Sequence, residues 1–225
     1  MSESVEMYLK TIFELAAEDA EPVAISSVAK RLGVSSVSAT EMIKRLVEQG
    51  VVLHTPYKGV ELTELGHRRA LSVLRRHRLW ERFLVDRLGI PWAASHDPAC
   101  RLEHATSDEV VEALAHYLGH PTTCPHGNEI PGPDGSVEVR PAVPLSQMGV
   151  GERGVVARVY PEETTLLEYL SERGIYPGQP ILVEDIAPYS GPLSVRIGGQ
   201  TVALGRTIAA HIFIASAEPG DKPEA

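Results

Sequence analysis

The hydrophobic positions near the start of the chain recur at the spacing of an α-helix. A first helix is predicted over about residues 4–18, with an apolar stripe made of Met7, Leu9, Ile12, Phe13, Leu15 and Ala16. Residues 26–33 predict a short second helix, with Ser26 as its N-cap and Gly33 at its end. Residues 37–49 predict a third helix that the next glycine ends. The first part of the chain is therefore expected to be mainly helical.

A short β-hairpin is predicted directly after these helices. Two β-type runs over residues 51–63 flank a turn that contains Pro56 and Gly59. Helix, short helix, turn, helix and hairpin is the element order of a winged helix-turn-helix, in which one helix reads the major groove of DNA. The pattern therefore predicts a DNA-binding domain over residues 1–72.

The next region begins with a much longer predicted helix. Residues 63–88 carry an apolar stripe and lead to a glycine. The stripe consists of Leu65, Leu71, Leu74, Trp80, Phe83, Leu84 and Leu88. Two shorter helices are predicted near residues 95–104 and 107–118, and the proline- and glycine-rich stretch 126–144 is expected to be a linker. We expect a helical domain, linker included, over residues 73–143.

From about residue 145 the pattern changes to short β-type runs divided by glycine and proline. The runs cover residues 154–160, 179–187, 193–199, 200–205 and 210–215, with one helical piece over 164–174. Short strands at this spacing are typical of a small β-barrel, which is expected over residues 144–217. Residues 218–225 are expected to be a frayed tail. The expected fold class is a mainly α winged helix-turn-helix and a further α-helical domain, followed by a small β-barrel.

The composition is that of a globular protein without a membrane span. The hydrophobic fraction of the 225 residues is 43%, and no apolar run reaches the roughly 18 residues that a membrane helix needs. The acidic start lacks the basic and apolar regions of a signal peptide, so we expect a cytoplasmic protein. The two cysteines, Cys100 and Cys124, form no CxxC motif, which disfavours a disulfide framework.

The net charge of −9 argues at first against nucleic acid, but the charges are unevenly distributed. Residues 1–90 hold 13 basic and 12 acidic side chains, whereas residues 91–225 hold 8 basic and 18 acidic ones. The acidic excess therefore lies in the second part of the chain. The first part can still bind DNA if its basic groups gather on one face.

The stretch HDPACRLEH, residues 96–104, is dense in potential metal ligands. His96, Cys100, Glu103 and His104 stand at positions i, i+4, i+7 and i+8, so a helix would place all four on one face. The plainer interpretation of any one of them is a polar side chain on a solvated helix face. Their number on one face favours a metal site.

Other potential ligands lie on neighbouring predicted elements. His77 and Glu81 are four residues apart on the long helix, and Met7 lies on the stripe of the first helix, where core packing is the plainer interpretation. Cys124 and His126 form a Cys-x-His pair in a loop, which is a weak signal alone. Imidazole and carboxylate suit Mn, Fe, Co, Ni or Zn, and a thiolate shifts the preference to softer ions. The tight Cys/His spacing of a structural zinc site does not occur.

Four segments together resemble the DtxR/MntR family of metal-dependent transcriptional regulators, which includes iron- and manganese-responsive repressors. They are EMYLKTIFEL, HRLWERFL, HDPACRLEHATSDEV and CPHGNEIPGPDG, and the third is the most specific. Three later segments, LSQMGVGERGVVARV, LSERGIYPGQPILV and VALGRTIAAHIFI, are similar to the SH3-like FeoA-type domain that ends longer members. The resemblance covers about residues 1–217.

This resemblance implies a homodimeric repressor that binds a palindromic operator in double-stranded DNA. The helical domain would be the metal-binding and dimerisation domain, and the small barrel would be SH3-like. Mn(II) or Fe(II) would be the co-repressor, and other divalent first-row metals would bind in vitro. Neither a membrane nor a small organic substrate is expected as a partner.

The resemblance also implies two metal sites. The primary, activating site would use Met7, Cys100, Glu103 and His104. The ancillary site would use His77, Glu81 and His96, with Glu162 or Glu163 of the SH3-like domain as a further ligand. Met7 and Cys100 match iron-responsive members. The CPHG segment resembles manganese-responsive members, in which the positions of Cys124 and His126 join a second site.

The recognition helix is expected to include Ser35, Val37, Ser38 and Glu41. The two serines suit phosphates or base edges, and Val37 suits a thymine methyl group. Glu41 departs from the neutral amide of iron-type members, because a carboxylate accepts from cytosine but repels phosphate. Phosphate contacts are expected from Lys44, Arg45 and Lys58, although a solvated face is as good an interpretation of each.

Two other functions stay open at the level of sequence. A metallohydrolase would use Glu103 as a general base beside a metal-bound water, but the chain has no HExxH motif. A thiol redox sensor would pair Cys100 with Cys124 and would respond to oxidant rather than to metal. A repressor, in contrast, needs metal to hold two recognition helices about one helical turn of DNA, roughly 34 Å, apart.

Overall fold

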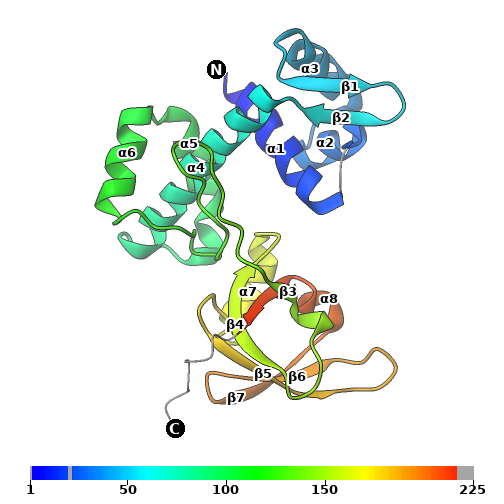
Figure 1. The fold of residues 1–225 in the computed structure, drawn as a ribbon, viewed down its shortest axis with the longest axis vertical. Coiled ribbons are helices and arrows are strands. Elements are labelled where there is room, and N and C mark those ends of the chain that lie inside the picture. The colour runs from blue at the N-terminus through cyan, green and yellow to red at the C-terminus, as the bar shows by residue number, and fades with distance from the viewer. Residues whose placement is uncertain (1, 20–21, 217–225) are drawn as a thin grey trace. The chain divides into compact units, whose positions relative to one another are not determined.

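The computed structural model describes residues 2–19 and 22–216 of the chain (Figure 1). These residues form two compact units. The first unit comprises the residues up to 77 together with 101–111 and 131–136, and the second comprises 78–100, 112–130 and the residues from 137 onward. The predicted tail over 218–225 lies outside the described residues.

The first unit contains three complete helices and a two-stranded hairpin (Figure 1), together with parts of the three helices that follow them in the chain. The elements are α1 (Glu3–Asp19), α2 (Ile25–Leu32), α3 (Ser36–Glu48), β1 (Val52–Thr55) and β2 (Gly59–Leu62). Their apolar faces meet in one core around Leu9, Ile12, Ile43 and Leu46, all at most 1% exposed. Burial of each such side chain stabilises the fold by about 1.5–3 kcal/mol. The order of elements is the predicted one.

The helix starts in this unit follow from different local signals. At α3 the hydroxyl oxygen of Ser35 accepts a hydrogen bond from the backbone N–H of Ser38 at 3.0 Å, which is a side-chain N-cap. The predicted N-cap of α2 is wrong, because the helix begins at Ile25, one residue before Ser26. Its first turn is closed by the backbone carbonyl of Ala24, so no side-chain cap is needed there.

The helical region continues with α4 (Glu64–Asp86), the short turn η1 (Trp92–Ala94), α5 (His96–Ala105) and α6 (Asp108–Tyr117). The long helix α4 begins one residue later and ends two residues earlier than predicted. Leu65 and Leu88, the ends of the predicted stripe, are 37% and 57% exposed, so the apolar face covers only the middle of the helix. His96 is the first residue of α5. The predicted helices are therefore present with small shifts at their ends.

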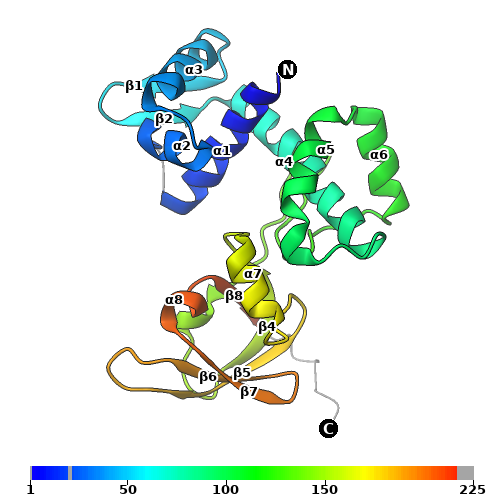
Figure 2. The same cartoon turned by 180° about the vertical axis from the view of Figure 1, so that it is seen from behind.

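The last part of the second unit is a six-stranded antiparallel sheet (Figure 2). In spatial order the strands are β3 (Val143–Pro144), β8 (Ile212–Ser216), β4 (Arg153–Val159), β5 (Pro180–Ile186), β6 (Leu193–Ile197) and β7 (Gln200–Leu204). The sheet is accompanied by η2 (Leu145–Gln147), α7 (Thr164–Ser171) and α8 (Arg206–Ala209). Within the described residues the backbone pairings leave β3 and β7 as edges, so the sheet is open.

The core of the second unit joins this sheet to the segment that follows α4. Trp92 of η1 belongs to the same buried cluster as Leu167 and Leu170 of α7. The indole N–H of Trp92 also donates a hydrogen bond to the hydroxyl of Ser171. A residue from the helical region is therefore packed into the sheet core, beside the helix that follows β4.

The stretch that was expected to be a linker is folded at its start. Cys124, His126 and Asn128 are buried. The N–H of Gly127 donates to the carbonyl of Cys124 at 2.9 Å and closes a turn, in which Gly127 has a φ of 85°. A Cβ on Gly127 would lie 2.0 Å from the carbonyl oxygen of Ala157 on β4. Only glycine allows the turn to approach the strand this closely.

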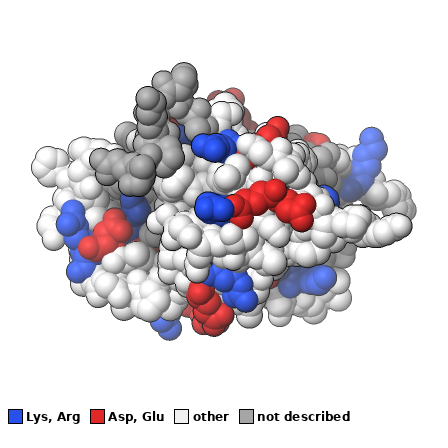
Figure 3. Space-filling view, turned by 90° about the horizontal axis from the view of Figure 1, so that it is seen from below, with Lys and Arg blue, Asp and Glu red and all other residues white. Residues whose placement is uncertain are grey.

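Charges on the surface are mixed rather than gathered. On the face of the molecule in Figure 3, acidic and basic side chains are interspersed. In the sheet, for example, the Nε of Arg196 lies 2.6 Å from a carboxylate oxygen of Glu184. This face offers no continuous basic surface among the residues that the structure describes. Over those same residues, no helix has both the length and the hydropathy that a membrane span requires.

Candidate metal centre

Four potential metal ligands meet in the interior of the second unit. One comes from α4, two come from the turn at residues 124–127, and one stands two positions before α7. The four are Glu81, Cys124, His126 and Glu162. One ligand atom from each lies within 4.8 Å of the others. A single ion at about 2.0–2.3 Å from each atom spans such distances.

The cluster is deeply buried and rich in negative charge. His126 is 0% exposed, and the side chains of Glu81 and Glu162 are 0% and 11% exposed. The Nδ1 of His126 lies 3.6 Å from Glu81, 3.7 Å from Glu162 and 3.7 Å from the sulfur of Cys124. Two carboxylates at this depth cost free energy unless a positive charge neutralises them. The cluster therefore favours a bound cation.

The acid–base properties of the cluster have the same cause. Burial alone would lower the pKa of His126, but hydrogen bonds to Cys124 and Glu81 and the charge of Glu162 raise it to about 12. Burial and the charges of the same two glutamates raise the pKa of the Cys124 thiol. The carboxylates thus favour positive charge within the cluster. A proton and a divalent ion compete to supply it.

Neighbouring groups hold the ligands in one orientation. The Nε2 of His126 lies 3.0 Å from the carbonyl oxygen of Trp92, and the two rings stack with their centroids 5.4 Å apart. Because a carbonyl only accepts, Nε2 carries a hydrogen and Nδ1 is the ligand atom. Asn128 donates to Glu162 at 2.6 Å and to the carbonyl of Val159 at 3.2 Å. Such supporting hydrogen bonds orient metal ligands.

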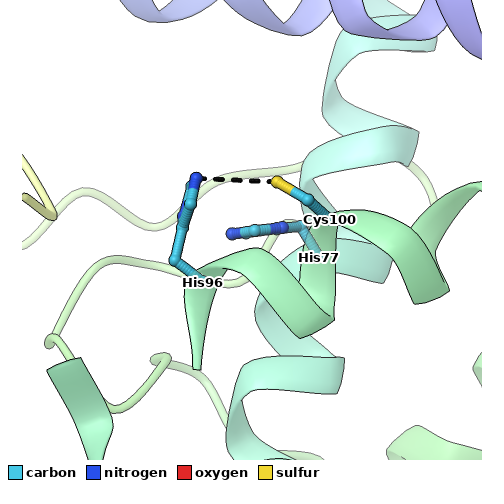
Figure 4. Close-up of side chains that lie close together, drawn as sticks. All are labelled: His77, His96 and Cys100. Atoms are coloured by element: carbon cyan, nitrogen blue, oxygen red, sulfur yellow. Dashed lines mark hydrogen bonds between the residues drawn. The ribbon is translucent and has the colours of Figure 1, made fainter. Parts of the chain in front are cut away.

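The first turn of α5 adds two more candidates. The Nδ1 of His96 lies 3.8 Å from Glu81 and 3.9 Å from Glu162. Cys100 follows one turn later, and Figure 4 shows its sulfur facing the His96 ring, 3.5 Å from Nε2. The side chain of His96 is 38% exposed, so this edge of the cluster faces solvent. The second unit therefore offers a fifth candidate ligand, His96, at the accessible side of the cluster.

Another group of acidic and basic side chains is buried in the first unit. Lys10 of α1 donates to both oxygens of Glu103 on α5, at 3.0 and 3.3 Å. The Nδ1 of His77 on α4 lies 2.5 Å from the same carboxylate. Burial alone would raise the pKa of Glu103, but the hydrogen bond from His77 and the charge of Lys10 together hold it below its ordinary value. Glu103 is therefore an ionised carboxylate that is 0% exposed.

Glu6 extends this network along α1. One of its oxygens lies 2.7 Å from Nδ1 of His104, and the other accepts a hydrogen bond from Arg76 at 2.8 Å. The Nε2 of His104 lies 3.3 Å from Glu103. Met7 follows Glu6 on the helix and is half-buried. The first unit therefore brings the candidates Glu103, His104 and His77 together with three charged residues that sequence reasoning missed.

Some of the missed residues had a weak signal in the sequence. Lys10 stands three positions after Met7 on one helix, so both share a face. Asn128 stands two positions after His126, in a stretch whose composition suggested a linker. Of the two glutamates left open, Glu162 lies in the cluster, whereas Glu163 is exposed and precedes the first turn of α7.

The candidate DNA-binding side chains lie on the surface of the first unit. All seven are exposed: Ser35, Val37, Ser38, Glu41, Lys44, Arg45 and Lys58. Val37 is 75% exposed, which is unusual for an apolar side chain on a packed helix. Lys44 pairs with Glu41 at 2.9 Å, a surface pair that contributes little to stability. The oxygen of Ser35 is already the cap of α3.

The donor set of the buried cluster fits a first-row divalent cation. It combines two carboxylates, an imidazole nitrogen and a thiol sulfur. Oxygen and nitrogen donors suit Mn(II) and Fe(II), and sulfur extends the range to Co(II) and Zn(II). The set differs from the four Cys/His ligands of most structural zinc sites.

Three family models match successive parts of the chain. Residues 1–60 match the N-terminal DNA-binding domain of iron-dependent repressors. Residues 63–132 match their metal-binding and dimerisation domain. Residues 143–216 match the FeoA domain.

Relatives match most of the length of the chain. The iron-dependent repressor IdeR of Mycobacterium tuberculosis is 34% identical over 219 residues, which are 92% of this chain and 94% of the relative. The diphtheria toxin repressor of Corynebacterium efficiens is 40% identical over 130 residues, which are 58% of this chain and 56% of the relative. A solved structure of a manganese-dependent transcriptional repressor in complex with manganese is 39% identical, with a TM-score of 0.86. It covers 95% of this chain and 100% of its own.

Proposed function

The chain belongs to the iron-dependent repressor family of DNA-binding regulators, and we propose that it represses transcription when a divalent metal is bound. The co-repressor is Mn(II) or Fe(II), because the relatives include iron-dependent and manganese-dependent repressors. The observation that carries the proposal is the buried cluster of Glu81, Cys124, His126 and Glu162. The family consists of transcriptional repressors rather than enzymes, so hydrolysis is set aside.

The ligands divide into two sites in this proposal. The first site uses Met7, Cys100, Glu103 and His104, as the family resemblance implies. The second site uses Glu81, His96, Cys124, His126 and Glu162, which the distances in the second unit support. His77 would ligate through Nε2, since its Nδ1 contacts Glu103. Glu163 is the weakest candidate, because it is exposed.

A bound divalent ion supplies fixed positive charge at the point where these segments meet. Residues of this chain bring the segments together and hold the ligands in position. Ligands of the second site come from α4, the start of α5, the turn at 124–127 and the segment before α7, so their convergence restricts the movement of all four. Trp92 and Asn128 keep two of these ligands in position. Restriction of this kind is the physical basis of coupling between metal and DNA, which is typically 5–150-fold in affinity.

The DNA-binding surface is assigned to the first unit. We assign the recognition contacts to Ser35 at the N-cap of α3 and to Val37, Ser38 and Glu41 on the helix. We assign the phosphate contacts to Lys44, Arg45 and Lys58. A homodimer places two such helices on a palindromic operator, at half-sites about one helical turn apart. We assign residues 1–72 to DNA binding, 73–143 to metal binding and dimerisation, and 144–217 to an SH3-like domain. The described strands of this last domain form an open sheet and not the closed barrel that the sequence predicted. The protein works in the cytoplasm.

The experiment that tests this function is retention of genomic DNA fragments by the full chain. Binding is compared with chelator, with Mn(II), with Fe(II) under anaerobic conditions and with Zn(II), each titrated. We expect fragments with palindromic sequences to be retained with Mn(II) or Fe(II) and released by chelator. Metal binding without retention of any fragment would refute the repressor function.

A variant pair links this DNA binding to the cluster. Glu162→Gln removes a charged ligand, whereas Glu163→Gln makes the same change at the exposed neighbouring position. Metal-dependent retention is expected to weaken only in Glu162→Gln. Equal behaviour of the two variants would remove the cluster from the mechanism.

A further inference from the structure

Lys10 occupies an unusual position for a lysine. Its side chain is 5% exposed, and its ammonium donates to both oxygens of Glu103, which is 0% exposed. An ammonium is strongly hydrated, so its burial costs free energy that only a close counter-charge offsets. Lysine is almost never buried to this degree unless it is paired. The Lys10–Glu103 pair is therefore a specific buried ion pair of the first unit.

Both oxygens of Glu103 are already engaged in this arrangement. Oε2 lies 3.0 Å from Lys10 and 2.5 Å from His77, and Oε1 lies 3.3 Å from Lys10 and 3.3 Å from His104. A metal ion that takes Glu103 as a ligand needs at least one of these oxygens. The metal ion therefore has to compete with the ammonium of Lys10 for the carboxylate of Glu103.

The charges of the network lead to the same conclusion. Glu6 and Glu103 carry two negative charges, and Arg76 and Lys10 carry two positive charges, so the group is balanced while its histidines are neutral. A divalent ion adds two positive charges, and a thiolate at Cys100 removes only one of them. Departure of the ammonium from Glu103 restores the balance.

Lys10 is better suited to leave than Arg76. Lysine is a compact point charge on a flexible stem, whereas the guanidinium of Arg76 bonds Glu6 at 2.8 Å and the hydroxyl of Ser72 at 3.3 Å. Lys10 also contacts Glu103, the carboxylate that the family resemblance assigns to the metal, whereas Arg76 contacts Glu6. The exchangeable cation is therefore Lys10.

We propose that Lys10 is an intrinsic competitor of the metal for Glu103, and that this competition sets the metal concentration at which the first site fills. The inference rests on the proposed function, in which Glu103 is a ligand of that site. The inference adds Lys10 as a residue that sets the metal concentration needed for the response. Lys10 is on α1 of the DNA-binding region. When a metal displaces Lys10 from Glu103, the lysine-mediated contact between α1 and α5 is therefore replaced by a metal-mediated one.

The test compares Lys10→Met with Arg101→Met in the full chain. Both changes remove one positive charge, but Arg101 is exposed on α5, two residues from Glu103. Mn(II) binding is measured by calorimetry, which reports the number of sites and each affinity. We expect Lys10→Met to bind Mn(II) at one site at least about tenfold more tightly. Arg101→Met should stay within about twofold of the original chain, because water screens an exposed charge.

A second variant keeps the proposal testable if Lys10→Met does not fold. Lys10→Arg retains the charge and offers a planar pair of N–H donors, which binds a carboxylate more strongly than an ammonium does. We expect this variant to bind Mn(II) at the first site at least about threefold more weakly. Unchanged affinity in folded Lys10→Met or in Lys10→Arg would overturn the inference.

Stability gives a readout that does not depend on DNA. Lys10→Met should lower the melting temperature of the metal-free protein, because the buried charge of Glu103 loses its counter-charge. Saturating Mn(II) should then raise the melting temperature more in Lys10→Met than in the original chain. An equal rise in both proteins would contradict competition.

One control separates this inference from the proposed function. If Glu103→Gln leaves the number of Mn(II) sites and their affinities unchanged, the assignment of Glu103 as a ligand fails, and the inference falls with it. If Glu103→Gln removes one site but Lys10→Met leaves its affinity unchanged, only the competition fails.

Discussion

The two units of the protein bury similar side chains but neutralise them in different ways. In the first unit, the carboxylates are contacted by Arg76 and Lys10, whose positive charges are permanent. In the second unit, Glu81 and Glu162 contact imidazoles, a thiol and an amide. Each unit therefore holds a candidate ligand group. In the first unit, lysine and arginine neutralise the charge of the carboxylates, and in the second unit a proton on His126 does so.

This difference determines which of the two groups gains more free energy from binding a metal. A carboxylate with its own lysine stays buried at modest cost, and a metal must displace that lysine. A carboxylate pair that relies on a protonated histidine gains the two positive charges of the ion, while His126 gives up one proton and the Cys124 thiol gives up another if its sulfur binds. We therefore expect the second unit to bind metal at a lower concentration than the first. Four experiments test this expectation.

Loss of a ligand in the second unit should have the largest effect. His126→Ala deletes the Nδ1 donor at the centre of the cluster. The Mn(II) affinity of that site should fall by more than the roughly 100-fold that loss of a supporting residue costs. Calorimetry should lose the tighter binding event and keep the weaker one. Two intact binding events in His126→Ala would show that the cluster is not a metal site.

Loss of the carboxylate in the first unit should affect the metal-free protein instead. Glu103→Gln leaves the ammonium of Lys10 buried beside a neutral amide, which should cost about 3 kcal/mol of unfolding free energy. Urea unfolding in the presence of chelator measures this loss. The matched control is Glu64→Gln, since the side chain of Glu64 is 88% exposed. A loss no larger than in the control would mean that the pair does not stabilise the unit.

A supporting residue should have a smaller effect than a ligand. Asn128→Ala removes the hydrogen bond to Glu162 but leaves all the proposed ligands in the chain. The affinity of the second site for Mn(II) should fall by about 10–100-fold. The number of binding events should stay the same, which distinguishes this variant from His126→Ala. A loss as large as in His126→Ala would mean that Asn128 does more than orient Glu162.

The pH dependence should show the smallest and most gradual effect. The pKa of His126 is raised in the folded state from 6.5 to about 12, so its stabilising contribution is complete below pH 6.5 and is lost as the pH rises toward 12. The metal-free protein should therefore lose stability above pH 6.5, while Mn(II) affinity rises because fewer protons compete. Melting temperatures with and without Mn(II) at several pH values measure both trends. His126→Ala should lack both slopes, and their persistence would assign them to another group.

Much of the fold could be predicted from the sequence because apolar periodicity reports directly on buried faces. Most helices, the hairpin and the β runs were expected within one or two residues of their positions, but α7 ends three residues earlier than predicted, and α8 and β3 were not predicted. Ser26 was mistaken for a cap because a serine before an apolar run resembles one, although the backbone of Ala24 closes that turn. Leu65 and Leu88 fit the stripe of α4 but are exposed, because periodicity does not reveal where the packing partner ends.

The candidate site could be predicted only in part. Candidate metal ligands were visible as residue types at helical spacing, but the side chains that contact them were not. Glu6 and Lys10, four residues apart on α1, have the spacing of an ordinary surface pair, and only tertiary packing buries them. The buried turn at residues 124–127 has the composition of a loop, because glycine and proline serve a linker and a tight turn equally well.

Trp92 gives the second unit an optical property. Its indole ring stacks on His126 at 5.4 Å, so its emission is sensitive to charge and to paramagnetic ions at the cluster. The only other tryptophan in the chain, Trp80, lies on α4 and packs edge-on against Phe83. After replacement of Trp80 by phenylalanine, quenching of the remaining fluorescence would report filling of the second unit alone. The protein thus contains an intrinsic indicator that separates one of its two ligand groups from the other without a label.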